Sequence, residues 1–191
     1  MSNKNNATTT PENFPAAGLA GDGWSTDDEA TATCYCGAVQ LKFPTHGPGL
    51  VNTFVCHCTD CHKITASMFA SNFTVLDTHL THVRGKENLK EFAQNETIVK
   101  NHLMTNYFCG TCGTLMYRVG SAFPGQSILR LGTVDDFSLM ETKLRPKHEV
   151  FVESRVSWIS GVEGAKQRGG AARQAADMFA REGKRDGGEK L

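Results

Sequence analysis

The chain lacks a surplus of charge of either sign and lacks any long apolar run. Its 191 residues carry 20 Lys and Arg against 20 Asp and Glu, so the formal net charge is zero. This balance excludes a global attraction to nucleic acid or to an anionic membrane, and we expect neither as a partner. No apolar stretch approaches the about 20 residues that a membrane-spanning helix needs. The first residues also lack the basic start and apolar stretch of a secretory signal, so we expect a cytoplasmic location, with the nucleus as the alternative.

Cysteine is absent outside three short clusters. The seven cysteines stand in Cys34-Tyr-Cys36, Cys56-His-Cys58-Thr-Asp-Cys61 and Cys109-Gly-Thr-Cys112. An odd number of cysteines at such spacings, without an export signal, is typical of metal ligation in a reducing compartment, and disulfide pairing is the alternative. Structural zinc sites take four protein ligands, whereas catalytic sites keep one position open. Seven divides into four plus three, which predicts two Zn²⁺ per chain, one structural and one able to do chemistry.

The first and third clusters each resemble one half of a zinc knuckle. In both, glycine follows the second cysteine directly, at Gly37 and at Gly113. Glycine there permits the positive-φ turn that folds backbone N–H groups onto the sulfurs. We expect the two halves to meet around a structural zinc, with the ligands Cys34, Cys36, Cys109 and Cys112.

The middle cluster offers three thiols, Cys56, Cys58 and Cys61, and no eighth cysteine completes the set. His62, which adjoins a ligand, could close this second site, whereas His57 lies between two ligands and should point away from the metal. We favour the other interpretation, in which the fourth position is open. Three thiolates around Zn²⁺ carry a formal charge of −1, which suits the binding and deprotonation of an exogenous thiol better than hydrolysis.

Three further assignments concern the surroundings of this second site. His62 and His148 are the candidate catalytic residues, because imidazole exchanges protons near neutral pH. A structural histidine at a strand start is the alternative for His148. Lys63 is the candidate substrate-binding residue, since its charge would compensate the negative charge that a bound thiolate adds.

Short strand patterns separated by turns fill the chain between residues 32 and 160. Several are rich in β-branched and aromatic residues, which favours strands. The candidate strands are residues 38–43, 49–54, 68–76, 88–92, 98–108, 114–119, 127–131 and 150–156. Short helical turns are expected at Asp60 and near Asp135-Asp136. This pattern predicts a mainly β domain.

The two ends of the chain differ in composition from the domain, which we place at residues 31–160. Residues 1–30 are rich in Asn, Thr, Pro, Gly and Ala and carry an acidic surplus, which predicts a mobile arm. Trp24 within it either docks on the domain or is exposed. Residues 161–191 form a mildly basic tail with seven Lys and Arg against five Asp and Glu. Residues 171–181 of this tail have the composition of a short C-terminal helix.

The cysteine clusters and their flanks together resemble a known family. The stretches that carry the resemblance are Cys34-Tyr-Cys36-Gly-Ala-Val, Cys56-His-Cys58-Thr-Asp-Cys61-His-Lys, Ser67-Met-Phe-Ala-Ser-Asn, Phe108-Cys109-Gly-Thr-Cys112-Gly-Thr, Leu129-Arg-Leu-Gly-Thr-Val-Asp-Asp and Arg145-Pro-Lys-His148 with Ser157-Trp158. In this order they resemble the glutathione-dependent formaldehyde-activating enzyme family, which includes centromere protein V. The resemblance covers about residues 32–160.

The resemblance implies a β-tent-like fold of small antiparallel sheets around two zinc sites. It implies the same four-plus-three division of the cysteines, with the catalytic zinc on the middle cluster. It also implies a carbon–sulfur lyase that joins glutathione to formaldehyde, giving S-(hydroxymethyl)glutathione. Lys63, Arg130 and Arg145 are cationic candidates for the glutathione carboxylates. The alternative is a non-catalytic, zinc-stabilised interaction module whose second zinc is closed by a histidine.

Overall fold

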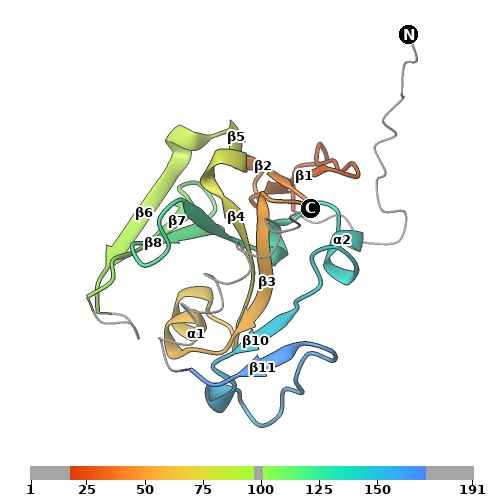
Figure 1. Ribbon diagram of the computed structural model, residues 1–191. Helices are drawn as coiled ribbons and strands as arrows, with labels where there is room; N and C mark the ends of the chain where they lie inside the picture. Colours follow the sequence, from red (N-terminus) through yellow and green to blue (C-terminus); the bar gives the residue numbers. More distant parts are fainter. Residues whose placement is uncertain (1–17, 97–100, 171–191) are drawn as a thin grey trace, which may run out of the picture.

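Two β-sheets make up most of the computed structural model, which describes residues 18–96 and 101–170 (Figure 1). The smaller sheet is antiparallel in the order β1-β2-β5, formed by β1 (Glu29–Thr33), β2 (Gln40–Pro44) and β5 (Thr81–Arg84). The larger has the order β11-β10-β3-β4-β9-β8-β7-β6. Its strands are β3 (Leu50–Cys56), β4 (Ala70–Leu76), β6 (Leu89–Gln94), β7 (Met104–Cys109), β8 (Leu115–Gly120), β9 (Gln126–Arg130), β10 (His148–Val150) and β11 (Lys166–Arg168). The predicted mainly β class is confirmed, although this sheet is mixed, because β10 runs parallel to both β3 and β11.

Helical segments are short and lie between the strands. The two α-helices are α1 (Thr59–Thr65) and α2 (Ser138–Glu141). The 3₁₀ turns are η1 (Asp77–His79), η2 (Lys86–Asn88), η3 (Leu131–Thr133) and η4 (Val152–Ser154). α2 follows Asp136, whose carboxylate accepts a hydrogen bond of 3.0 Å from the backbone N–H of Ser138. The helical turns expected at Asp60 and near Asp135-Asp136 are therefore both confirmed.

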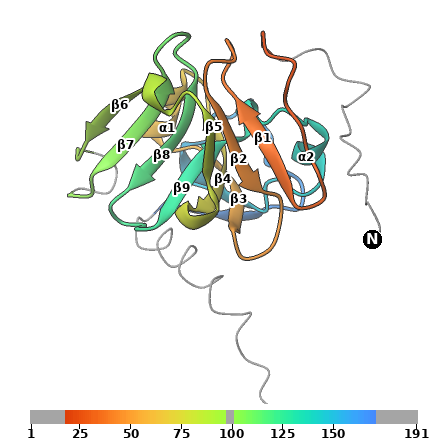
Figure 2. The same cartoon turned by 90° about the horizontal axis from the view of Figure 1, so that it is seen from above.

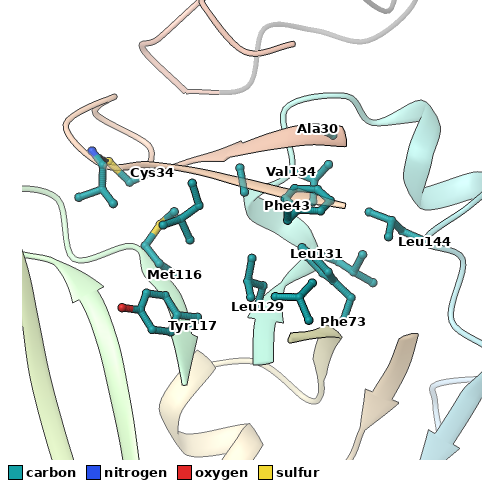
Figure 3. Packing of buried hydrophobic residues seen from close by; sticks show 14 of the residues in the cluster. Ala30, Cys34, Phe43, Phe73, Met116, Tyr117, Leu129, Leu131, Val134 and Leu144 are labelled. Carbon is teal, nitrogen blue, oxygen red and sulfur yellow. Dashed lines mark hydrogen bonds between the residues drawn. The ribbon is translucent and has the colours of Figure 1, made fainter. Parts of the chain in front are cut away.

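The main hydrophobic core lies between the two sheets. Figure 3 shows Phe43 of the small sheet packed toward Phe73 and Leu129 of the large one. The ring centroids of Phe43 and Phe73 are 4.6 Å apart, and both side chains are fully buried. Complete burial of such a side chain contributes about 2 kcal/mol to stability. This core holds the small sheet on one face of the large sheet.

A second buried group covers the opposite face of the large sheet. Side chains alternate between the two faces of a strand, and on β4 Phe73 belongs to the main core whereas Ala70 belongs to the second group. On β9 the same division separates Leu129 from Ile128. Seen from above, β1, β2 and β5 lie in front of the large sheet and α1 lies behind it (Figure 2). The second group therefore lies on the α1 side.

The strand expected at residues 150–156 is wrong in its extent. Extended pairing stops at Val150, because Phe151 adopts a left-handed conformation with φ of 59° and a 3₁₀ turn follows. Strands β1, β5 and β11 were not expected. β5 and β11 are only four and three residues long and carry mostly polar, partly exposed residues, so neither forms an apolar pattern in the sequence.

The ends of the described chain lie against the domain. The backbone of Trp24 is bound to β1, since its C=O accepts a bond of 3.0 Å from the Thr31 N–H, and the residue is half-buried. Asp22 forms an ion pair with Arg84 of β5. The boundaries drawn at residues 30 and 160 stay predictions. Residues 1–17 and the helix expected at 171–181 lie outside the described residues. Within the described part of the chain, no helix is long and apolar enough to cross a membrane.

Candidate metal centres

Four cysteines from two distant segments converge at one end of the main core. Their Sγ atoms, from Cys34, Cys36, Cys109 and Cys112, all lie within 4.8 Å of one another. The Sγ of Cys36 is 3.6 Å from that of Cys34 and 3.7 Å from that of Cys109. All four are free thiols, so the short separations do not come from disulfides. The cluster joins the turn between β1 and β2 to the end of β7.

The turns around these sulfurs have the expected glycine geometry. Gly37 and Gly113 have φ of 82° and 76°. Backbone and side-chain N–H groups point at the sulfurs: Val39 N–H lies 3.2 Å from Sγ of Cys34, and Asn88 Nδ2 lies 3.3 Å from Sγ of Cys109. Burial nevertheless raises the pKa of Cys34 to about 12. Four converging sulfurs that must lose protons in a buried place fit a bound Zn²⁺, which thiolates prefer.

The remaining three cysteines converge on the opposite side of the large sheet. Cys56 ends β3, Cys58 caps the N-terminus of α1 and Cys61 lies in its first turn. Their Sγ atoms are within 4.8 Å of one another, and all three side chains are buried. The Sγ of Cys58 also accepts a bond of 3.3 Å from the Cys61 N–H. In the part of the chain that the structure describes, no histidine nitrogen or carboxylate oxygen joins this group of three.

A buried ion pair fixes the residue between the first two of these cysteines. Nε2 of His57 lies 2.7 Å from Oε1 of Glu149, and both side chains are 1% exposed. The other carboxylate oxygen accepts bonds from Nη1 of Arg155, at 3.1 Å, and from the Val162 N–H, at 3.3 Å. Burial raises the pKa of Glu149, but the bonds from His57 and Arg155 outweigh it and bring the pKa below its ordinary value. His57 is thus tied to β10, as expected for a residue between two ligands.

Two guanidinium groups, those of Arg118 on β8 and Arg130 on β9, act on the cluster of three. The pKa of the Cys61 thiol lies well below its ordinary value, because the thiols of Cys56 and Cys58 hydrogen-bond to it and both arginine charges favour its thiolate. Burial lowers the pKa of Arg130 to about 10, and the charge of Arg118 adds to that shift. Burial opposes the charge of Arg118 as well, but the neighbouring thiols bring its pKa above the ordinary value. The three sulfurs therefore lie in a positive field.

The candidate catalytic and substrate-binding residues differ in how far they are exposed to solvent. His62 lies on α1, and its Nε2 is buried with no hydrogen-bond partner among the described residues. Lys63, the next residue on the same helix, is exposed. His148 is buried on β10, opposite Phe54 of β3. The roles assigned to these side chains stay predictions.

Two charged residues near the cluster of three were not singled out from the sequence. Arg118 follows the buried Tyr117 in β8, and Glu149 stands between two buried residues in β10. A charged residue inside a short buried strand is costly unless it is paired. That pattern is the signal that could have identified both residues.

The family model described as glutathione-dependent formaldehyde-activating enzyme matches residues 29–154, which include all seven cysteines. No curated protein matches the chain. The crystal structure of a Rhodobacter sphaeroides protein is similar, with a TM-score of 0.41 and 17% sequence identity over 72% of this chain and 98% of that one. Because the family model spans well over half of the sequence, the chain belongs to the family of glutathione-dependent formaldehyde-activating enzymes.

Proposed function

We propose that this protein is a zinc-dependent carbon–sulfur lyase. It binds a thiol, with glutathione as our candidate, and adds it to formaldehyde or another small aldehyde, or releases it in the reverse direction. Two Zn²⁺ per chain are part of the proposal, one held by the four-cysteine group and one by Cys56, Cys58 and Cys61. The family assignment supports the reaction class, and the grouping of the sulfurs supports the metal sites.

The observation that carries the proposal is the size of the second sulfur group. Three thiols meet there, and no histidine or carboxylate of the described residues completes the set. The alternative, a non-catalytic interaction module with a closed second zinc, needs a fourth protein ligand such as His62. Its Nε2 does not belong to the group of three, which favours an open position.

The secondary structure fixes the three sulfurs before any substrate arrives. Cys58 and Cys61 are held by the first turn of α1, and Cys56 by the end of β3. Glu149 on β10 accepts the Nε2 proton of His57 and so fixes the residue that stands between Cys56 and Cys58 in the sequence. Zinc bound by these sulfurs would supply a fourth position at which the pKa of an exogenous thiol falls.

The reaction needs one proton to move. The thiol loses its S–H proton, a C–S bond forms while the C=O π bond breaks, and the former carbonyl oxygen takes up a proton. Nε2 of His62 is buried and has no hydrogen-bond partner among the described residues, so we assign it to hold this proton. His148 is the second candidate for this role. Lys63, exposed on α1, is assigned to the negative groups of glutathione.

A Cys58→Ser variant tests the proposal, with Cys36→Ser as the matched control in the other cluster. We expect Cys58→Ser to keep its circular dichroism spectrum, to lose one of two zincs, and to lose catalysed exchange between thiol and hydroxymethyl thiol in an NMR exchange measurement. Cys36→Ser should instead lose folded structure, because structural zinc contributes directly to folding free energy. Full activity of a folded Cys58→Ser protein would disprove the catalytic assignment.

A further inference from the structure

The face of the large sheet on the α1 side is unusually polar for a buried surface. Six side chains there have buried nitrogen or oxygen atoms without a hydrogen-bond partner among the described residues: Asn52, Thr74, Asn106, Arg118, Gln126 and Arg130. Buried polar groups in folded proteins are nearly always hydrogen-bonded. A concentration of such atoms on one face indicates that a polar ligand or ordered water satisfies them.

The strand register brings these side chains onto the same face as the cluster of three cysteines. Thr74 pairs with Ile128, and Ile128 pairs with Arg118, so the three side chains form a row across β4, β9 and β8. Arg130 lies two residues beyond Ile128 and pairs with Asn72 in the next row. Ile128 belongs to the same buried group as the three cysteines. Arg118 and Arg130 therefore lie on the cysteine side of the sheet, diagonally across from one another.

Both arginines face the thiol of Cys61, and each keeps at least one donor that has no partner of its own in the described part of the chain. Nη1 of Arg130 donates to Oδ1 of Asn72, whose amide group in turn donates to the Ala70 C=O at 2.9 Å. Nε and Nη2 of Arg130, and Nε of Arg118, are buried and have no partner among the described residues. Arg130 is only 6% exposed. Two neighbouring guanidinium groups with free donors in a buried place are a binding arrangement for an anion.

Before a substrate binds, the formal charges leave a surplus of one positive charge, which the thiolate or a carboxylate of a reactant can neutralise. Three thiolates and one Zn²⁺ sum to −1, and the two guanidinium groups bring the total to +1. The buried carboxylates of the described residues do not supply the missing charge. Asp136 is bound to Ser25 and Ser138, and Glu149 is bound to His57 and Arg155.

We propose that Arg118 and Arg130 form a carboxylate-binding site next to Cys56, Cys58 and Cys61, and that one reactant carries a carboxylate close to its reacting atom. The proposal rests on the proposed thiol–aldehyde reaction. A guanidinium group binds a carboxylate through two parallel N–H bonds. Because both guanidinium groups face the thiol of Cys61, a carboxylate bound to them lies beside the zinc-binding sulfurs.

This placement favours an aldehyde that bears the carboxylate on its carbonyl carbon, a 2-oxo acid of the glyoxylate type. The thiol sulfur then adds to the carbonyl carbon, the C=O π bond breaks, and the oxygen takes the proton that the thiol has lost, giving a 2-hydroxy-2-thio acid. Alternatively, the thiol reactant carries the carboxylate, as a short mercapto acid does. In glutathione the carboxylates are several bonds from the sulfur, so they fit this position less well.

Binding of a carboxylate that cannot react tests the site without any activity assay. Calorimetric titration of the zinc-loaded protein with glycolate should show binding, and titration with the neutral glycolamide should not. Arg118→Gln and Arg130→Gln should each weaken glycolate binding about tenfold, the loss of one charge-assisted pair. Lys90→Gln, which removes an exposed charge from β6, is the control and should leave binding within about twofold.

Activity with matched reactants identifies which partner carries the carboxylate. With 2-mercaptoethanol as the thiol, glyoxylate should exceed acetaldehyde in catalysed adduct formation by about tenfold or more. If formaldehyde instead reacts faster with 3-mercaptopropionate than with 2-mercaptoethanol, the thiol is the carboxylate source. Equal rates in both comparisons, or equal glycolate and glycolamide affinities, would overturn the proposal even if the arginine variants fail to fold. Glycolate binding that depends on the arginines, without adduct formation by any pair of thiol and aldehyde, would refute the proposed lyase function. The carboxylate-binding site itself would still stand.

Discussion

The carboxylate of Glu149 links three segments of the chain, with one hydrogen bond to each. It joins His57 in the cysteine segment to Arg155 in the loop after η4 and to the backbone of Val162. Because His57 stands between two of the cysteines, these bonds also restrict how Cys56 and Cys58 are presented. Groups that orient metal ligands in this way affect a site nearly as much as the ligands do.

Replacing Glu149 with glutamine should therefore destabilise the protein in a pH-dependent way. The pKa of Glu149 lies below its ordinary value of 4.5 in the folded chain. Its contribution to the free energy of unfolding is then complete above pH 4.5 and is lost as the pH falls through the folded pKa. We expect Glu149→Gln to cost about 3 kcal/mol at pH 7, since it breaks a buried pair.

Urea unfolding at pH 7, 5 and 4 measures this effect. The difference between wild type and Glu149→Gln should shrink at the lowest pH, and zinc release recorded on the same samples separates this effect from acid loss of metal. Glu141→Gln, at an exposed position of α2, is the control and should show no measurable difference. A difference that stays constant with pH would mean that the carboxylate charge is not what stabilises this contact.

At the scale of the elements, the knuckle turns determine how the two sheets are tied together. Gly37 and Gly113 both have positive φ, but their surroundings differ. A Cβ atom built at Gly37 would approach Cβ of Ala20 to 2.8 Å, whereas at Gly113 it would meet no atom within 4 Å. The first turn therefore requires glycine for its conformation and for space, and the second for its conformation alone.

Gly37→Ala and Gly113→Ala form a matched pair that separates these two requirements. Alanine in the left-handed region costs about 1 kcal/mol, and we expect that loss for Gly113→Ala. Gly37→Ala should lose more, because the segment that contains Ala20 must move. Thermal unfolding of both variants with zinc bound measures the difference, and equal losses would show that the contact with Ala20 relaxes freely.

Sequence patterns predict the local features of these elements well and the non-local ones poorly. The group of three cysteines could be predicted because Cys56, Cys58 and Cys61 are close together in the sequence. The start of α1 near Asp60 could be predicted for the same reason. The position of Arg118 beside Cys61 could not be predicted from the sequence. It depends on β8 lying next to β9, and β9 next to β4, which is an order that no short window of sequence contains.

For the molecule as a whole, the two sulfur groups lie on opposite faces of the large sheet. The four-cysteine group belongs to the main core and ties β1 and β2 to the end of β7, whereas the group of three packs with α1 on the other face. Loss of the first group would free one end of the small sheet, which covers the main core. Loss of the second would release only the short α1 segment and the end of β3.

Chelation should therefore remove metal in two separate steps. The group of three would lose its zinc first, because three protein ligands hold a metal less firmly than four. We expect a titration with a chelator to release one zinc per chain with no change in circular dichroism, and the second only together with loss of β-structure. Colorimetric zinc release and circular dichroism, recorded on the same sample, would follow both steps. Cys58→Ser is the control and should show the second step alone, and simultaneous release of both zincs from the wild-type protein would refute the division into one exchangeable and one structural metal.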